Sequence, residues 1–274
     1  MTHETFTFNV YDTDLYGQLW QPDYVKAVVI LLHGMGEHAS RYEDLVIPKL
    51  VENDYAIVTY DNFGHGRTKG KRGHCPSYDA LMQGIKSAID VAENKFPKVP
   101  QFLYGHSMGG NLVINYALKE HPELKGVIAT SPFLRLAFKP PKWKINLGKA
   151  MLKVWPSLTL PSELEVDAIS RIPEEVKKYQ EDALVHDKVS PMFTFPIMQR
   201  GEWAIKNIDK LTIPMFVLHG TGDRIIDHKA SEELANGSNF IHLELFENGY
   251  HELHHDLCKE EMIGSIMNWL DSHI

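Results

Sequence analysis

The chain has 274 residues, 43% of them hydrophobic and 23% charged, an ordinary globular composition that excludes a disordered chain. Its formal net charge of −8 at pH 7 argues against a general nucleic-acid partner. The two cysteines, Cys75 and Cys258, do not make a disulfide framework, so we expect a reducing, cytoplasmic setting. The longest uninterrupted apolar run, residues 27–32, is far too short to cross a bilayer, and the N-terminus lacks the basic and apolar regions of a signal peptide.

Strand-like and helix-like segments take turns along the chain. Residues 5–10 alternate between apolar and polar side chains and residues 14–20 partly do so, which predicts an antiparallel hairpin at a sheet edge. Short apolar runs typical of parallel strands buried on both faces follow at 27–32, 55–60, 101–104, 126–130, 213–219 and 240–246. Helix-length segments lie between them, at about 41–53, 78–95, 108–120, 229–236 and 252–272. This order predicts an α/β fold with a mostly parallel, doubly wound sheet.

The alternation is interrupted once, between the strand ending near Ser131 and the strand beginning at Ile213. A structureless loop of roughly 80 residues would be implausible in a compact domain. The interval holds two proline-bearing joints and helix-like pieces near 142–155, 163–170, 173–184 and 197–206. We therefore predict a helical cap, or lid, over residues 134–206, inserted into an α/β core formed by residues 1–133 and 207–274.

A candidate nucleophile lies in the G-x-S-x-G motif GHSMG at residues 105–109. The predicted strand 101–104 precedes the motif and the predicted helix 108–120 follows it, which is the strand–turn–helix setting of a nucleophile elbow. A helix N-terminus at this point favours the negative charge that develops when a serine attacks a carbonyl. We predict Ser107 as the nucleophile; the alternative is a glycine-rich helix start with no chemistry.

A serine hydroxyl becomes a good nucleophile when a histidine takes its proton and a carboxylate orients that histidine. In this fold the three residues follow one another as serine, acid and histidine, each on a loop after a strand. Asp223 follows the predicted strand 213–219, and His251 is the only histidine in the loop after the last predicted strand. Asp227 is the alternative acid, but we expect it to cap the next helix. Ser107, Asp223 and His251 are therefore the predicted triad.

The loop after the first buried strand is the candidate for the second half of an oxyanion hole. Residues 33–38 read HGMGEH, and the two glycines let the loop fold back so that a backbone amide points into the site. A hole of this type pairs one such amide with the amide after the nucleophile. We predict the N–H groups of Met35 and Met108 as the oxyanion donors.

Several segments resemble the monoacylglycerol lipase and lysophospholipase group of α/β-hydrolases, which are similar to the serine aminopeptidase S33 hydrolases. The similar motifs occur in the same order, at residues 33–42, 61–73, 105–110, 220–224 and 249–256, and two cap segments, 156–164 and 179–190, are also similar. The resemblance implies cleavage of lipid-like carboxylic esters, foremost monoacylglycerols, through a Ser-His-Asp acyl-enzyme, without metal or organic cofactor, under a mobile lid over an acyl tunnel. A lysophospholipase or a broad carboxylesterase or thioesterase remains the alternative.

The same resemblance implies residues for the alcohol end of the pocket. Glu37, Arg41 and His254 match positions that line this pocket, and Tyr179 matches a tyrosine of the cap near it. Considered alone, Glu37 and Arg41 could equally form an i,i+4 ion pair at a helix start, and His254 is expected one turn into the last helix. Met35 stands where the mammalian lipase has alanine, which leaves the acyl-chain preference open.

A basic stretch in the cap is a candidate lipid-facing surface. No acidic residue occurs between Phe133 and Ser162, whereas this acidic protein has six basic residues there: Arg135, Lys139, Lys142, Lys144, Lys149 and Lys153. On a helical wheel three of the lysines lie roughly opposite an apolar stripe that includes Trp143. Such a helix could lie on an anionic membrane or micelle surface, or its apolar face could pack onto the cap with the lysines solvated.

Two patterns in the sequence are also typical of other functional classes. Residues 251–255 match the zinc-protease pattern H-E-x-x-H, but they straddle a predicted loop-to-helix joint and lack a third ligand. Gly34, Gly36 and Ala39, with Asp61 at the end of the next strand, imitate a dinucleotide fingerprint, but Glu37 would repel a pyrophosphate. A non-catalytic α/β-hydrolase relative that only binds ligands usually lacks part of the triad, and the oligomeric state is left open.

Overall fold

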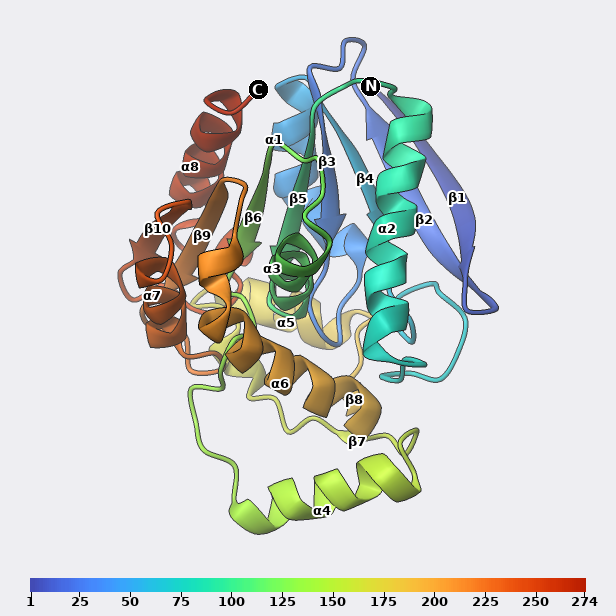
Figure 1. Ribbon diagram of the computed structural model, residues 1–274, viewed down its shortest axis with the longest axis vertical. Coiled ribbons are helices and arrows are strands. Elements are labelled where there is room, and N and C mark those ends of the chain that lie inside the picture. Colours follow the sequence, from blue (N-terminus) through green and yellow to red (C-terminus); the bar gives the residue numbers. More distant parts are fainter.

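An eight-stranded sheet with helices on both faces forms the body of the protein, and the computed structural model describes all of residues 1–274 (Figure 1). The strand order is β1-β2-β4-β3-β5-β6-β9-β10. The first two strands, β1 (Thr2–Val10) and β2 (Thr13–Gln21), form the predicted antiparallel edge hairpin, and β2 pairs antiparallel with β4. All other neighbours pair in parallel: β3 (Ala27–Leu32), β4 (Tyr55–Tyr60), β5 (Gln101–His106), β6 (Gly126–Thr130), β9 (Met215–Gly220) and β10 (Ile241–Phe246).

Helices pack on the two faces of the sheet and form two separate hydrophobic cores. The larger core lies between the sheet and α2 (Tyr78–Lys95), α3 (Met108–Glu120) and α7 (His228–Asn236). The smaller core lies under α1 (Val46–Glu52) and α8 (Lys259–Asp271). This arrangement confirms the predicted α/β-hydrolase fold with a doubly wound sheet. No helix is both long enough and apolar enough to cross a lipid bilayer.

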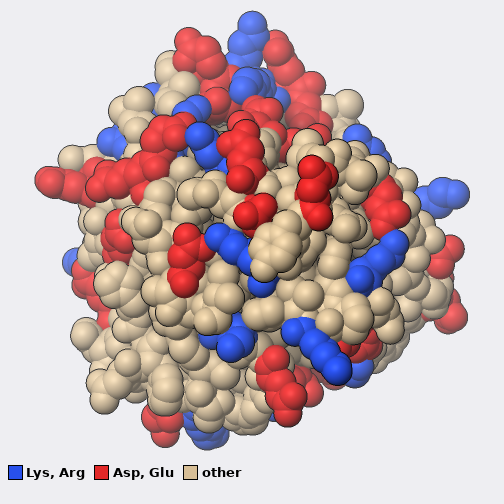
Figure 2. Space-filling view, turned by 90° about the horizontal axis from the view of Figure 1, so that it is seen from above, with Lys and Arg blue, Asp and Glu red and all other residues tan.

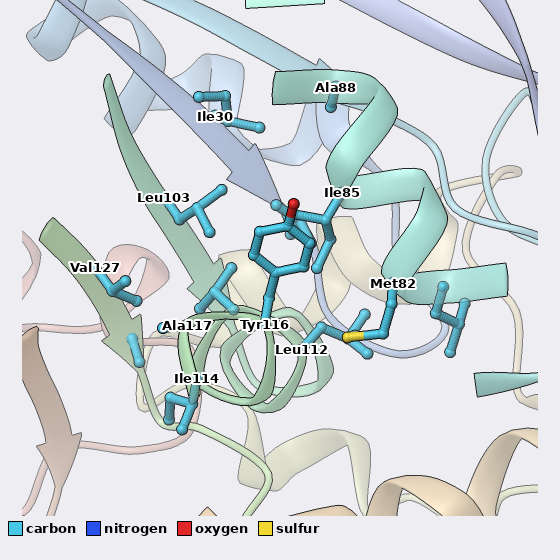
Figure 3. Close-up of a cluster of buried hydrophobic side chains, with 14 of the residues drawn as sticks. Ile30, Met82, Ile85, Ala88, Leu103, Leu112, Ile114, Tyr116, Ala117 and Val127 are labelled. Carbon is cyan, nitrogen blue, oxygen red and sulfur yellow. The ribbon is translucent and has the colours of Figure 1, made fainter. Parts of the chain in front are cut away.

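The regular pattern of the sequence explains the larger core. Every residue of β3 and of β5 is buried, because helices cover both faces of these central strands, which accounts for their largely apolar sequences. The α2 helix begins at the N-cap Ser77, whose hydroxyl accepts a hydrogen bond from the Ala80 amide. Its buried stripe meets α3 and the strands (Figure 3), with side chains interdigitating at Ile30, Met82, Ile85, Leu103, Leu112, Tyr116 and Val127.

Outside the segment between β6 and β9, three predicted elements differ from the structure. The predicted buried strand 240–246 is an edge strand, β10, that pairs only with β9 and stays largely half-exposed. The predicted helix 41–53 is split into a 3-10 turn (Ala39–Asp44) and α1, because the backbone at Leu45 leaves the helical region. The predicted helix 252–272 begins only at Lys259, and a separate 3-10 turn (Leu253–His255) precedes it. His254 is thus not in the last helix.

Between β6 and β9 the chain forms the cap segment, residues 134–206. Its elements are α4 (Lys142–Val154), β7 (Leu160–Pro161), a 3-10 turn (Val166–Ala168), α5 (Pro173–Glu181), β8 (Lys188–Val189) and α6 (Pro191–Lys206); a 3-10 turn (Ile208–Lys210) then leads to β9. The expected helix near 163–170 is only the 3-10 turn Val166–Ala168 within irregular backbone, and the short β7–β8 pair was not predicted. The cap segment stacks on the core, with α6 against α3 and α4 against α6. None of the residues of α4 is buried, and α4 lies at the end of the molecule opposite both termini (Figure 1).

Candidate active site

Ser107 stands in a sharp turn between β5 and α3. Its backbone has φ 52° and ψ −111°, a strained conformation that residues other than glycine rarely adopt. The Ser107 amide donates to the Thr130 carbonyl at 2.9 Å, which ties the turn to β6. The turn also needs glycine at 105, because a Cβ atom there would lie 2.2 Å from the Gly109 carbonyl oxygen. The lack of a side chain at Gly105 therefore allows the end of β5 and the start of α3 to approach each other closely at the serine.

The three residues predicted as a triad lie together at the carboxyl ends of β5, β9 and β10. The Ser107 Oγ atom is 2.9 Å from His251 Nε2, and His251 Nδ1 is 2.6 Å from Asp223 Oδ2. All three residues are buried, with exposed fractions of 6% for Ser107, 7% for Asp223 and 6% for His251. A hydroxyl, an imidazole and a carboxylate linked in this order can transfer a proton away from the hydroxyl.

Four hydrogen bonds hold the Asp223 carboxylate. Its Oδ2 accepts from His251 and, at 3.1 Å, from Nε2 of His219, while Oδ1 accepts from the amides of Ile225 and Ile226 at 2.8 and 3.0 Å. Burial by itself would raise the pKa of Asp223, but the charge and hydrogen bonds of His251 and His219 lower it well below its ordinary value. The carboxylate is therefore ionised and has a fixed orientation.

The alternative acid has another role. Asp227 is the N-cap of α7, and its side chain accepts from the Lys229 amide at 3.1 Å. Capping of this kind satisfies an amide of the first helical turn that would otherwise lack a partner. Its position agrees with the expectation from the sequence, and the structure brings Asp223 rather than Asp227 to the histidine.

His251 is positioned through its backbone as well as its ring. Burial by itself would lower the pKa of His251, but the charge of Asp223 and its hydrogen bond raise it above the ordinary value. The His251 carbonyl accepts a hydrogen bond from the Ser131 hydroxyl at 2.7 Å. Neither Ser131 nor His219 was singled out from the sequence, because each contacts the triad only after β6 and β9 have been brought together in the sheet.

The loop that carries Met35 packs against the nucleophile. A Cβ atom built on Gly34 would lie 3.3 Å from the Cβ atom of Ser107, and the Gly34 amide donates to Glu37 Oε1 at 2.5 Å. The amides of Met35 and Met108 donate to no acceptor within the chain. Both N–H groups are thus free to bind an oxygen atom at this point, as an oxyanion hole requires.

A cavity of about 510 Å³ opens from Ser107 and His251, within the size range of small-molecule sites. Most of its apolar lining comes from the cap segment, with Leu136, Phe138, Ile145, Leu164, Phe195 and Met198. The polar residues Glu37, Tyr179 and Glu252 line it together with Ser107 and His251, and so do three ion pairs, Lys144–Glu163, Asp187–Lys188 and Glu165–Arg224. An elongated apolar group with a polar end would match these two kinds of lining.

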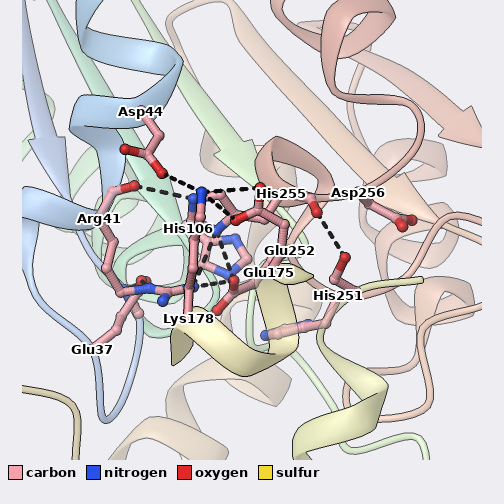
Figure 4. Close-up of polar contacts among 12 residues, drawn as sticks. Glu37, Arg41, Asp44, His106, Glu175, Lys178, His251, Glu252, His255 and Asp256 are labelled. Atoms are coloured by element: carbon pink, nitrogen blue, oxygen red, sulfur yellow. Dashed lines mark hydrogen bonds and ion pairs between the residues drawn. The ribbon is translucent and has the colours of Figure 1, made fainter. Parts of the chain in front are cut away.

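The residues predicted for the alcohol pocket separate into two groups. Glu37 and Tyr179 line the cavity, whereas Arg41 and His254 lie behind its wall, contrary to the expectation. Arg41 Nε donates to Glu37 Oε2 at 3.0 Å, and its guanidinium also binds Glu252 (Figure 4). The guanidinium lies 4.7 Å from the centre of the Tyr179 ring. The i,i+4 ion pair is therefore present, but it is buried and part of a larger cluster.

His254 is packed among aromatic rings. Its ring centre lies 4.7 Å from that of Tyr42 and 4.8 Å from that of His106, and neither ring nitrogen has a partner in the chain. Glu252, which does line the cavity, was missed by sequence reasoning. Its position next to His251 was the only available signal, because the contact with Arg41 spans 211 residues.

The geometry does not fit the zinc or dinucleotide alternatives. Both ring nitrogens of His251 are engaged, one by Ser107 and one by Asp223, so His251 cannot also serve as the first histidine of an H-E-x-x-H zinc site. Ligand atoms of Glu252, His254 and His255 lie within 4.8 Å of one another, but the Arg41 guanidinium contacts two of these residues and would repel a cation. In the loop, the Glu37 carboxylate takes the Gly34 amide that a phosphate would need.

Comparison with known proteins agrees with this geometry. Residues 23–258 match the sequence model of the family described as "Serine aminopeptidase, S33". The chain belongs to this family of α/β-hydrolases. The crystal structure of a monoacylglycerol lipase from Paleococcus ferrophilus superposes on this S33 hydrolase with a TM-score of 0.88 at 33% identity, and the match covers 95% of this chain and 99% of that one. The resemblance drawn from the sequence motifs is therefore confirmed.

The matches to two further relatives cover very different shares of the lengths of those proteins. It is 28% identical over 260 residues to the monoacylglycerol lipase of Mycolicibacterium smegmatis, which covers 93% of this chain and 92% of that protein. It is 34% identical over 254 residues to an uncharacterized abhydrolase domain-containing protein of Dictyostelium discoideum, of which it spans only 26%. The same fold thus occurs both as a nearly whole protein and as part of a longer one.

Proposed function

We propose that this protein is a serine ester hydrolase that cleaves monoacylglycerols to glycerol and a fatty acid, with Ser107, His251 and Asp223 as its catalytic residues. The observation that carries the proposal is the hydrogen-bonded series from Asp223 through His251 to Ser107, which ends at a cavity lined by apolar side chains of the cap and by polar side chains next to the triad. The similarity to two monoacylglycerol lipases over nearly the whole chain supports the same substrate.

In the first half of the reaction Ser107 becomes acylated. His251 Nε2 takes the proton of the Ser107 hydroxyl as the oxygen bonds to the ester carbonyl carbon, and the resulting oxyanion accepts hydrogen bonds from the amides of Met35 and Met108. The tetrahedral intermediate then expels the alcohol oxygen, which receives the proton from His251. Asp223 remains ionised throughout and stabilises the imidazolium that forms between the two proton transfers.

In the second half water releases the acid. His251 takes a proton from a water molecule, whose oxygen attacks the acyl carbonyl in the same oxyanion hole. The bond to Ser107 then breaks, and His251 returns a proton to the serine oxygen. The fatty acid leaves, and the protein's own side chains suffice for every proton transfer.

The shape of the cavity supports a lipid ester with a small polar alcohol. An acyl chain removes apolar surface from water when it lies along Leu136, Phe195 and Met198. The hydroxyl groups of a glycerol head would meet hydrogen-bond partners at Glu37 and Tyr179. We also propose that residues 134–206 act as a lid, because this segment supplies most of the apolar wall.

The test is fatty-acid release from monoacylglycerols by the wild type and by Ser107→Ala. We expect the substitution to lower turnover by several orders of magnitude, since the remaining triad members act only through the serine. A thermal melt should show that the variant is folded. Equal turnover by both proteins, or no hydrolysis of any carboxylic ester by the wild type, would reject the proposal.

We further propose that the cap binds an anionic membrane surface through α4. Five apolar side chains in or beside α4 are between 54% and 81% exposed: Phe138, Trp143, Leu147, Val154 and Trp155. The apolar stripe is therefore not buried against the rest of the cap. Exposed lysines accompany it, at positions 142, 144, 149 and 153. The opposite end of the molecule carries acidic and basic side chains interspersed, with the acidic ones prominent (Figure 2), so the α4 end is the one suited to anionic lipid.

Binding to vesicles containing phosphatidylglycerol tests this second proposal. Trp143→Ala and Trp155→Ala should weaken co-sedimentation with the vesicles while the hydrolysis of short soluble esters is nearly retained, because neither residue lines the cavity. Phosphatidylcholine vesicles provide the uncharged control. Unchanged binding in both variants would reject a role for α4 at the membrane.

We also propose that the protein works in the cytoplasm. The unpaired thiols of Cys75 and Cys258 support a reducing setting. Cell fractionation with an antibody against the protein tests this, and recovery of the protein only outside the cytoplasm would contradict it.

A further inference from the structure

The loop that carries His251, residues 250–256, is hydrogen-bonded to residues 168–171 of the cap segment. Three bonds join the two stretches: the Glu252 amide to the Ile169 carbonyl at 2.8 Å, the His251 amide to the Ala168 carbonyl at 3.5 Å, and the Ser170 hydroxyl to the His255 carbonyl at 2.7 Å. A piece of the cap that lies 85 residues earlier in the chain therefore holds the backbone of the proposed catalytic histidine.

The side chain of Asp256 makes a fourth connection between the cap and this loop. Its Oδ2 accepts a hydrogen bond at 2.8 Å from the amide of Tyr250, the residue before His251. Arg171 of the cap donates to the same carboxylate twice, from its amide to Oδ1 at 2.8 Å and from its Nε to Oδ2 at 2.9 Å. The carboxylate thus links Arg171 directly to the neighbour of His251.

Arg171 supplies the positive charge that a buried carboxylate requires. The Asp256 side chain is 0% exposed, and its one ion pair is with Arg171. An ionised carboxylate is very unfavourable away from water unless a cation and hydrogen bonds accompany it. Without Arg171 the loop would have to move until Asp256 reached water or another partner. Such a movement would displace Tyr250 and the histidine that follows it.

Neither Arg171 nor Asp256 lines the cavity, so neither side chain can contact a bound ester. We propose that Arg171 is a positioning residue for the reaction, which acts through Asp256 to keep His251 within hydrogen-bond distance of Ser107. This inference rests on the proposed ester hydrolysis at Ser107. It also means that residues 168–171 stay in place when the proposed lid moves, because they belong to the support of the catalytic histidine.

A small displacement of His251 should have a large effect on the reaction. Its Nε2 is 2.9 Å from Ser107 Oγ and its Nδ1 is 2.6 Å from Asp223 Oδ2, and hydrogen bonds weaken outside this range. A misplacement of about 1 Å, caused by a substitution far from the chemistry, can cost about 10²-fold in rate. Because His251 transfers protons and does not bind the acyl chain, the loss should fall on kcat rather than on KM.

The experiment compares Arg171→Met with the wild type on a short soluble ester. Methionine removes the charge and the donors but keeps much of the apolar stem. Arg135→Met is the matched control, because Arg135 is also a half-buried arginine of the cap that pairs with two acids. Its side chain binds Glu202 in α6 and Glu233 in α7, away from the loop of His251.

We expect Arg171→Met to lower kcat by about tenfold to 10²-fold with little change in KM, and Arg135→Met to keep both constants. Proton NMR gives a second readout, through the low-field resonance of the His251 Nδ1 proton in its bond to Asp223. This resonance should shift or broaden in Arg171→Met and stay in place in Arg135→Met. A loss of stability alone would not move it. Wild-type kcat together with an unmoved resonance in Arg171→Met would overturn the inference.

Asp256→Asn and the double variant Arg171→Met/Asp256→Asn test the route through Asp256. If Arg171 acts through this carboxylate, the double variant should lose about as much kcat as the more impaired single variant. Losses that multiply in the double variant would overturn this route. The double variant has no unpaired charge at residue 256, so it replaces Arg171→Met if that protein does not fold. Wild-type kcat and an unmoved resonance in it would then overturn the inference.

The two proposals fail in different ways. A wild-type protein that hydrolyses no carboxylic ester would reject the proposed function itself. A wild-type protein that hydrolyses esters, with an Arg171→Met variant equal to it in kcat and in the His251 resonance, would keep that function and reject only the positioning role of Arg171.

Discussion

The backbone amide of His186, in the cap segment, donates a hydrogen bond to the carbonyl oxygen of Gly36, 2.9 Å away in the loop that carries Met35. The His186 ring is fixed as well, with Nε2 2.9 Å from the Gly64 carbonyl. A hydrogen bond of 2.8 Å between His38 Nε2 and Asp182 Oδ2 also joins this loop to the cap. The cap therefore does more than cover the cavity, because it also holds the loop that supplies one of the proposed oxyanion donors.

Gly36→Ala tests this connection between the cap and the loop. Gly36 has φ +82°, and a Cβ atom there would lie 2.6 Å from the His186 carbonyl oxygen, so alanine must displace either the loop or the cap. Because a misplaced oxyanion donor acts on the transition state, we expect kcat to fall by up to about 10²-fold with a smaller change in KM. Steady-state kinetics measure both constants.

The control for this substitution is Gly264→Ala, at a helical position with open space around it. It should leave kcat unchanged. A Gly36→Ala protein with wild-type kcat and wild-type affinity for a boronic acid inhibitor would show that the loop does not depend on this contact.

The pH dependence of kcat/KM should report the state of His251. The charge of Asp223 outweighs burial and raises the pKa of His251 above the ordinary histidine value of 6.5. A protonated His251 cannot accept the serine proton. Activity should therefore be at its full value above this raised pKa and should be lost as the pH falls through it. A pH–rate profile with a short soluble ester should show this acid limb centred above pH 6.5.

Asp223→Asn should move the acid limb to lower pH, because it removes the charge that raises the pKa of His251. It should also lower kcat by about 10⁴-fold, as the loss of the carboxylate does in a comparable triad. A limb that stays in place in this variant would mean that another group controls the pH dependence.

His219→Phe should move the acid limb in the opposite direction. His219 Nε2 donates to Asp223 Oδ2, the oxygen that also holds His251. Without this donor the carboxylate has more negative charge available for His251, so the pKa of His251 should rise and the limb should shift to higher pH. The lost orientation should lower kcat by about tenfold. A shift to lower pH would contradict this account.

Substitutions in the core and in α4 should differ sharply in their effect on stability. Leu103 in β5 is fully buried, so Leu103→Ala should lower the free energy of unfolding by about 2–5 kcal/mol. Leu147 in α4 is 54% exposed, so Leu147→Ala should change it by less than about 0.5 kcal/mol. Urea unfolding followed by circular dichroism measures both. A comparable loss in the two variants would indicate that α4 packs more tightly than the structure shows.

Local sequence patterns were sufficient to predict the strands of the main sheet, most helices and the positions of the three proposed triad residues. Each triad residue follows a strand with a clear apolar run, and the order of strands in this fold brings those loops to one edge. The same reasoning misplaced His254, because the apolar period of α8 was extended back to residue 252. The side chain of Asp256 instead accepts hydrogen bonds from the Tyr250 and Arg171 amides, which keeps this segment out of the helix.

Groups that act on the site from distant segments could not be predicted in this way. Glu252 depends on Arg41, which is 211 residues away, and the Ser131 hydroxyl reaches the carbonyl of His251 across 120 residues. The two-residue strands β7 and β8 are too short for a periodic pattern. These contacts exist only once the cap and the core have come together, so no local pattern encodes them.

The lack of buried residues in α4 has a consequence for how this enzyme family can change. A helix whose side chains contribute little to the core can be exchanged for another sequence at little cost to folding. Residues 142–154 therefore form a replaceable unit, through which the surface proposed to meet lipid could diversify between related hydrolases while the proposed chemistry at Ser107 stays the same.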